Sequence, residues 1–302
     1  MRKTITIETV YQCNCHLGKE TLHPLISVID LSKAKEKQQT FLKLGFYTVL
    51  LKECKCESII YGRKFYDYSD GTIIFLSPGE SIDIENNNQM LCSQGWMLAF
   101  HYDLIKNSPL ERRIQDYTFF NYQKKEALHL SSREKDTIFK CLESINEELY
   151  QNIDKYSKIL IINKIELFLN YCTRFYNRQF ITRDKANKDL LKKTELILNN
   201  YFQTDQARIN GLPTSTYCAR LLNLSPAYFE DLLKHETGKN TYEYIQFKQI
   251  NVAKRQLLET NKTIGQIAEE TGFSSSLHFT RLFKKITGYA PDKYRMPKMK
   301  LD

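Results

Sequence analysis

The chain has 302 residues and a mass of 35.7 kDa, with 42% hydrophobic and 26% charged residues. This composition is typical of a globular protein with room for two domains, and it excludes a small disulfide-stapled scaffold and a fibrous or disordered chain. The formal net charge is +9, and residues 188–302 hold 18 lysines and arginines against 12 acids. The basic excess at the C-terminal end suggests a polyanionic partner.

The N-terminal segment alternates apolar and polar residues from Thr4 to Ile7 and lacks the apolar run of a secretion signal. No stretch of about 18 apolar residues occurs, so we expect no membrane span and no membrane partner. We therefore expect a cytoplasmic protein whose eight cysteines are mostly reduced thiols.

Residues 1–103 have the pattern of β structure. Segments 3–10, 46–51, 59–68 and 72–76 alternate or are rich in β-branched and aromatic residues, and the turn Ser77-Pro78-Gly79 follows the last of them. Short strands with frequent turn signals predict a barrel or a sandwich.

Two cysteine pairs lie in this region, Cys13 with Cys15 and Cys54 with Cys56. In a strand, each pair would lie on one face, where four thiolates are able to bind zinc, although the usual spacing is Cys-x₂₋₄-Cys. We favour ordinary buried residues and keep a thiol or metal sensor as the alternative. No His-x-His pair, phosphate-binding loop or nucleophile elbow occurs, so we expect neither an enzyme nor a cofactor.

Residues 104–176 change to a helical period and predict a helical hairpin. One apolar stripe comprises Ile138, Leu142, Ile145 and Leu149, and a second comprises Leu160, Ile161, Ile165, Phe168, Leu169 and Cys172. We expect these stripes to form a homodimer contact, with packing inside one chain as the alternative. The polar segment 177–188 is the expected linker, and the next domain covers 189–302.

The C-terminal region contains an internal repeat with an offset of 49 to 50 residues. The first copy contains, in order, Ala219, Asn223, Leu224, Ser225, Phe229, Leu232, Lys234, Thr237, Gly238 and Tyr244. The same places in the second copy hold Ala268, Gly272, Phe273, Ser274, Phe279, Leu282, Lys284, Thr287, Gly288 and Tyr294.

Each copy has the features of a helix-turn-helix. Thr263 and Gln266 form a capping-box pattern, and Gly272 or Asn223 supplies the left-handed residue of a tight interhelical turn. Phe279, Leu282, Phe283 and Ile286 then form an i, i+3, i+4, i+7 stripe that faces the core.

The outward face of the second copy predicts DNA contacts, because residues 274–287 contain three cations and no acid. The expected contacts are Ser275, Ser276, His278, Thr280, Arg281, Lys284, Lys285 and Thr263. Residues 241–259 predict a linker helix of about 30 Å, which approaches the ~34 Å helical repeat of B-DNA.

These motifs, together with Gln256-Leu257-Leu258, His278-Phe279 and the segment from Gly288 to Arg295, resemble the AraC/XylS family of bacterial transcription regulators. The resemblance implies an α+β protein with an N-terminal cupin-like β-barrel, dimerisation helices and an all-α domain of two helix-turn-helix units. It also implies double-stranded DNA and RNA polymerase as partners, a small-molecule effector in the barrel, and activation of transcription.

The first recognition helix departs from the family pattern, since 226–237 carries Glu230, Asp231 and Glu236 against Lys234. Either this helix contacts DNA little, or an acid accepts a hydrogen bond from a cytosine amino group. Tyr228, Lys234 and His235 are the expected contacts to the DNA backbone here. The alternative function is a small-molecule, thiol or metal sensor that contacts nucleic acid without sequence preference.

Overall fold

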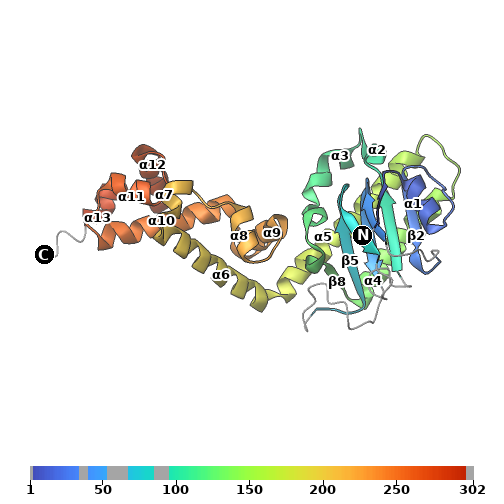
Figure 1. The fold of residues 1–302 in the computed structure, drawn as a ribbon, viewed down its shortest axis with the longest axis horizontal. Coiled ribbons are helices and arrows are strands. Elements are labelled where there is room, and N and C mark those ends of the chain that lie inside the picture. The colour runs from blue at the N-terminus through green and yellow to red at the C-terminus, as the bar shows by residue number, and fades with distance from the viewer. Residues whose placement is uncertain (1–2, 34–39, 53–66, 85–94, 297–302) are drawn as a thin grey trace. The chain divides into compact units, whose positions relative to one another are not determined.

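A computed structural model describes residues 3–33, 40–52, 67–84 and 95–296 of the chain (Figure 1). The chain divides into two compact units, Met1–Arg183 and Asp184–Asp302. The first unit contains all the described strands, and the regular elements described in the second unit are all helices. No helix in the described ranges is both long and apolar enough to cross a membrane.

The strands of the first unit form two sheets. The smaller sheet has the order β1 (Lys3–Ile7), β3 (Thr40–Leu44), β6 (Ser81–Ile84), with β1 and β3 parallel. The larger sheet is antiparallel, in the order β2 (Ile26–Asp30), β7 (Gly95–Phe100), β4 (Tyr47–Lys52), β5 (Gly71–Leu76), β8 (Leu128–Leu130). Both sheets are open over the residues described, so the closed barrel expected from the resemblance is not observed.

The two sheets share one apolar core. Alternate residues of the strands point to the same side, so that Leu42 and Leu44 of β3 pack in one cluster with Ile74 of β5 and Met97 and Ala99 of β7. The described strands of both sheets therefore contribute to one packed cluster.

Residues 10–17 form a helix, α1 (Val10–Leu17), instead of continuing the predicted strand. Thr9 and Gln12 form a capping box at its start, and Gly18 adopts the left-handed conformation at its end. A helix separates Cys13 and Cys15 by about 200° of rotation, and Cys13 is buried while Cys15 is exposed. The premise that both thiols share a face was therefore wrong.

The alternative of a thiol or metal site finds no further support in the described residues. Cys54 and Cys56 lie outside the described residues. Among the residues that the structure does describe, no group of three or more His, Cys, Asp or Glu side chains is arranged to hold a metal ion. Burial raises the pKa of the Cys13 thiol to about 12.

After β7 the chain forms short helices before the long pair. These are α2 (Tyr102–Ile105) and α3 (Pro109–Arg113), followed by single 3₁₀ turns and by β8, which returns to the sheet. The predicted helical pair is confirmed as α4 (Ser132–Leu149) and α5 (Ser157–Thr182). Except for Leu160, both predicted apolar stripes are buried within the unit, so they are not the surface of a dimer contact.

The expected linker 177–188 is helical rather than irregular. Helix α5 extends to Thr182 and α6 begins at Asp184. Between them, Arg183 donates to Asp67 through Nε at 3.0 Å and Nη2 at 2.6 Å, in an ion pair whose side chains are 7% and 0% exposed. This polar segment thus contains a buried structural contact, which composition alone did not distinguish from a solvated linker.

The second unit consists of eight described helices, α6 (Asp184–Gln203), α7 (Gln206–Asn210), α8 (Ser215–Leu221), α9 (Pro226–Thr237), α10 (Thr241–Glu259), α11 (Ile264–Glu270), α12 (Ser276–Thr287) and α13 (Pro291–Arg295). The pairs α8–α9 and α11–α12 are the two predicted helix-turn-helix units. Figure 1 shows α8 and α9 near one end of α10, and α11 to α13 near the other. The predicted linker helix is confirmed with the bounds 241–259.

Candidate nucleic-acid interface

The two helix-turn-helix units are built alike. Their first helices both have seven residues and their second helices both have twelve. Asn223 has φ 55° and Gly272 has φ 87°, as the repeat predicted for the two turns. An equivalent backbone bond closes each turn, from Leu224 N to Ala219 O at 2.9 Å and from Phe273 N to Ala268 O at 2.8 Å.

Matched caps fix where each recognition helix begins and ends. The hydroxyl oxygen of Ser225 accepts from Tyr228 N at the start of α9, and that of Ser275 accepts from His278 N at the start of α12, both at 3.2 Å. Each helix ends at a glycine in the left-handed conformation. Thr263 caps α11 through the predicted capping box with Gln266.

Helix α12 separates an apolar face from a polar one. Phe279 and Phe283 are fully buried, while Leu282 and Ile286 are partly buried against the same cluster. The exposed residues of the polar face are Ser276, His278, Arg281, Lys284 and Lys285. Within the described part of the chain, no acid pairs with Arg281, Lys284 or Lys285. Their charges therefore remain available to an external anion.

Contacts inside the domain orient several of these side chains. The His278 ring packs edge-on against Phe273, with ring centroids 5.6 Å apart, so it is held near the start of α12. The Thr280 hydroxyl donates to Ser276 O at 2.8 Å, which leaves its oxygen as an acceptor. The first turns of α12 thus present uncharged hydrogen-bonding groups, and the cations follow in the later turns.

Leu277 is a surface residue that the sequence prediction omitted. Its side chain is 60% exposed at the first turn of α12, beside Ser276 and His278. The sequence could have identified this residue, because Leu277 is apolar but lies outside the buried stripe that contains Phe279. Such a side chain is suited to contact a thymine methyl group.

The first recognition helix presents a different surface. Tyr228 is 3% exposed and belongs to the interior of the domain. The prediction that this residue contacts the DNA backbone was therefore wrong. Lys234 and His235 are exposed, together with the acid Glu230. The carboxylate of Glu236 accepts from Asn187 Nδ2 at 3.1 Å, which uses this acid inside the domain.

Comparisons with known proteins agree with this geometry. Residues 218–296 match the helix-turn-helix domain family. The chain is 39% identical over 77 residues to the HTH-type transcriptional regulator YobQ of Bacillus subtilis, a match that covers 26% of this chain and 32% of YobQ. It is 40% identical over 107 residues to the bifunctional transcriptional activator and DNA repair enzyme AdaA of the same organism, covering 35% of this chain and 47% of AdaA.

A solved transcriptional regulator of Chromobacterium violaceum, described as containing an AraC-type DNA-binding domain, aligns at 23% identity with a TM-score of 0.32. That alignment covers 37% of this chain and 93% of the solved chain. The chain spans about a third of YobQ and about half of AdaA. Residues 218–296 therefore form a helix-turn-helix DNA-binding domain of the AraC/XylS type.

Proposed function

We propose that the whole protein is a sequence-specific DNA-binding transcription regulator that inserts α12 and α9 into successive major grooves. The observation that carries this proposal is the pair of matched helix-turn-helix units joined by α10. At 1.5 Å per residue, the 19 residues of α10 span about 28 Å, which suits adjacent grooves of one duplex face.

The side chains of α12 suggest separate roles in recognition. Arg281 is suited to donate two N–H hydrogen bonds from its guanidinium group, one to the O6 atom and one to the N7 atom of guanine. Lys284 and Lys285 are suited to neutralise phosphates. Ser276, His278 and Thr280 supply polar contacts to base edges, and Leu277 supplies an apolar one. Thr263 is exposed at the start of α11 and adds a polar contact to the DNA.

A competition experiment tests this proposal. DNA sites selected from a random pool by the intact chain are measured against bulk DNA at one fixed salt concentration. A specific regulator prefers its site by roughly 10³-fold or more. Equal affinity for selected and bulk DNA would instead support the alternative, a sensor with non-specific nucleic-acid contacts.

We further propose activation through RNA polymerase. This proposal rests on the family resemblance and on the relative AdaA, which is described as a transcriptional activator. Transcription in vitro from a promoter with the selected site upstream should rise when the protein is added, and a fall would identify a repressor.

For self-association, the support comes from an apolar stripe of α5 that remains exposed. Leu160 and Leu167 are 43% and 51% exposed, and their spacing places them on one face of the helix. Tyr156, the N-cap residue of α5, is 55% exposed next to them. We propose that this face, rather than the buried stripes first predicted, forms a symmetric homodimer contact.

We propose that a small-molecule effector binds in a cavity of about 250 Å³ beside β2, an edge strand of the larger sheet. Its lining includes Lys19, Trp96 and Tyr150, which combine a cation with two aromatic walls. Trp96 is the one tryptophan of the sequence, so its fluorescence should change when a library compound binds here. Binding that leaves Trp96 emission unchanged would place the effector elsewhere.

A further inference from the structure

The two halves of the DNA-binding unit have separate apolar cores. One cluster includes Phe202, Ala207, Phe229 and Leu233, and the other includes Ala268, Phe273, Phe279 and Phe283. Helix α10 contributes residues to both clusters. Halves joined along one helix are able to shift about it by small sliding movements, so a second contact is needed to fix their relative rotation.

Helix α7 is attached firmly to the first half. Tyr201 Oη donates to Gly211 O at 3.1 Å, and Tyr217 Oη donates to Gln206 Oε1 at 3.1 Å. Ala207 is fully buried in the first cluster. This short helix therefore moves with α6 and α8.

The opposite side of α7 meets the interhelical turn of the second half. A Cβ atom added at Gly272 would lie 2.7 Å from the Ala207 carbonyl oxygen and 3.3 Å from its carbonyl carbon. No side chain fits between these backbones without displacing one of them. Close by, Arg208 Nε lies 3.2 Å from Glu269 Oε1 of α11.

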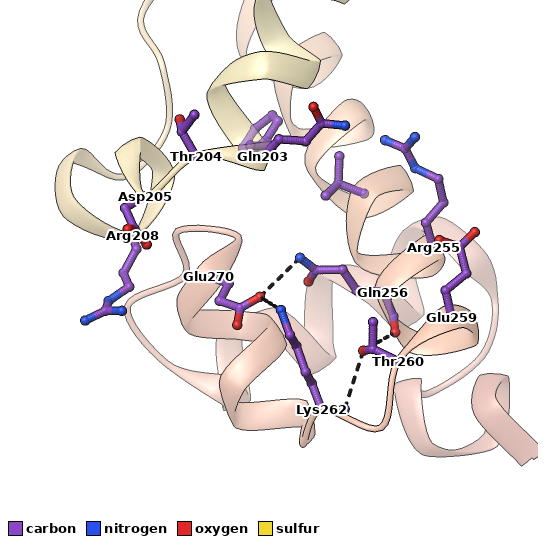
Figure 2. Close-up of a pocket in the computed structure, with 12 residues that line it drawn as sticks. Gln203, Thr204, Asp205, Arg208, Arg255, Gln256, Glu259, Thr260, Lys262 and Glu270 are labelled. Carbon is purple, nitrogen blue, oxygen red and sulfur yellow. Dashed lines mark hydrogen bonds and ion pairs between the residues drawn. The ribbon is translucent and has the colours of Figure 1, made fainter.

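Next to this contact the two halves are held apart. A cleft of about 430 Å³ lies between α7 and the segment formed by the end of α10 and α11. Figure 2 shows Asp205 and Arg208 on one side of it, and Gln256, Lys262 and Glu270 across from them. The cleft leaves open space beside this contact. The contact between α7 and the Gly272 turn therefore limits how closely the two halves approach each other.

We propose that the packing of α7 on the Gly272 turn sets the rotation between α9 and α12, and thereby determines the half-site spacing that the protein prefers. This inference rests on the proposed function. One base pair of B-DNA turns the helix by about 34–36°, so a small change in the angle between the recognition helices alters which spacing fits.

The test compares two asparagine substitutions. Asparagine tolerates the left-handed conformation, as Asn223 does in the first turn, so Gly272→Asn keeps the turn but places a side chain against Ala207. Gly288 has φ 82° and open space where its Cβ would lie, so Gly288→Asn is the matched control. Affinities are measured for the intact protein on selected sites with the half-sites moved by −1, 0, +1 and +2 base pairs.

In Gly272→Asn we expect the ratio of affinities between the preferred spacing and its neighbours to fall roughly tenfold, which is the scale of one good base contact. Gly288→Asn should keep the wild-type ratio. Arg208→Glu breaks the ion pair with Glu269, whose two side chains are 56% and 65% exposed, so it tests the same contact without disturbing a core. It should relax the preference in the same way. Lys192→Glu, an exposed cation of α6, is its charge control.

If the ratio of affinities between neighbouring spacings stays at its wild-type value in Arg208→Glu, and in Gly272→Asn where it folds, the inference is overturned, even when binding is uniformly weaker. A wild-type chain that prefers no sequence at all would refute the proposed function instead, so the two failures are distinguishable.

Discussion

Arg281 and Lys285 divide the two tasks of DNA recognition at the scale of single residues. Both are exposed on the acid-free face of α12. Arg281→Ala should cost about 1–3 kcal/mol at one base position and relax specificity there, because a bidentate contact is lost. Lys285→Ala should weaken binding to all sequences alike and reduce the salt slope by about one. Equal losses on every sequence for both variants would reject the assignment.

Burial also separates the chemistry of two neighbouring thiols. The pKa of Cys13 is raised to about 12 by burial, so this thiol stays protonated at pH 8, whereas Cys15 is exposed. Since the thiolate is the reactive form, iodoacetamide should label Cys15 much faster than Cys13 in the native protein. Peptide mass spectrometry measures both rates, and similar rates would show that Cys13 is not in the core.

At the scale of elements, the second unit was largely predictable from local signals. The capping box of Thr263, the turn residues Asn223 and Gly272 and the apolar stripe of α12 each depend on a few neighbouring residues. Helix α1 was missed because the cap at Thr9 starts a helix only eight residues long. The lateral contact between Gly272 and Ala207 joins residues 65 positions apart, so no local pattern predicts it.

The acids of α9 give the two recognition helices unequal roles. Glu230 lies in the second turn of α9, beyond the first turn where the helix dipole favours an acid, and its charge repels DNA phosphates. Replacing Glu230 by Ser and Asp231 by Arg, after Thr280 and Arg281 of the second copy, should therefore strengthen non-specific binding and steepen its salt dependence.

A control with the same change of charge is Asp205→Ser with Glu259→Arg, at exposed positions outside both recognition helices. It should raise non-specific binding less than the α9 variant. If the α9 variant loses the selected site while circular dichroism shows the fold intact, the acids read bases, and α9 contributes more than this charge argument assigns to it.

At the scale of the whole molecule, the exposed stripe of α5 predicts the oligomeric state. Charged residues in an apolar contact are strongly unfavourable, so Leu160→Glu with Leu167→Glu should give a monomer in sedimentation. Leu196→Glu, at a leucine of α6 that is 68% exposed, should leave the wild-type dimer intact. A wild-type mass that stays monomeric at all concentrations, with and without DNA, would contradict the dimer.

The central claim is that one chain places two recognition helices in successive major grooves. Hydroxyl-radical footprinting of the intact protein on its selected site measures this directly. The claim predicts two protected segments on one face of the duplex, centred about 10 base pairs apart, with α12 giving the stronger protection. A single protected segment, or weak protection spread evenly along the DNA, would contradict it.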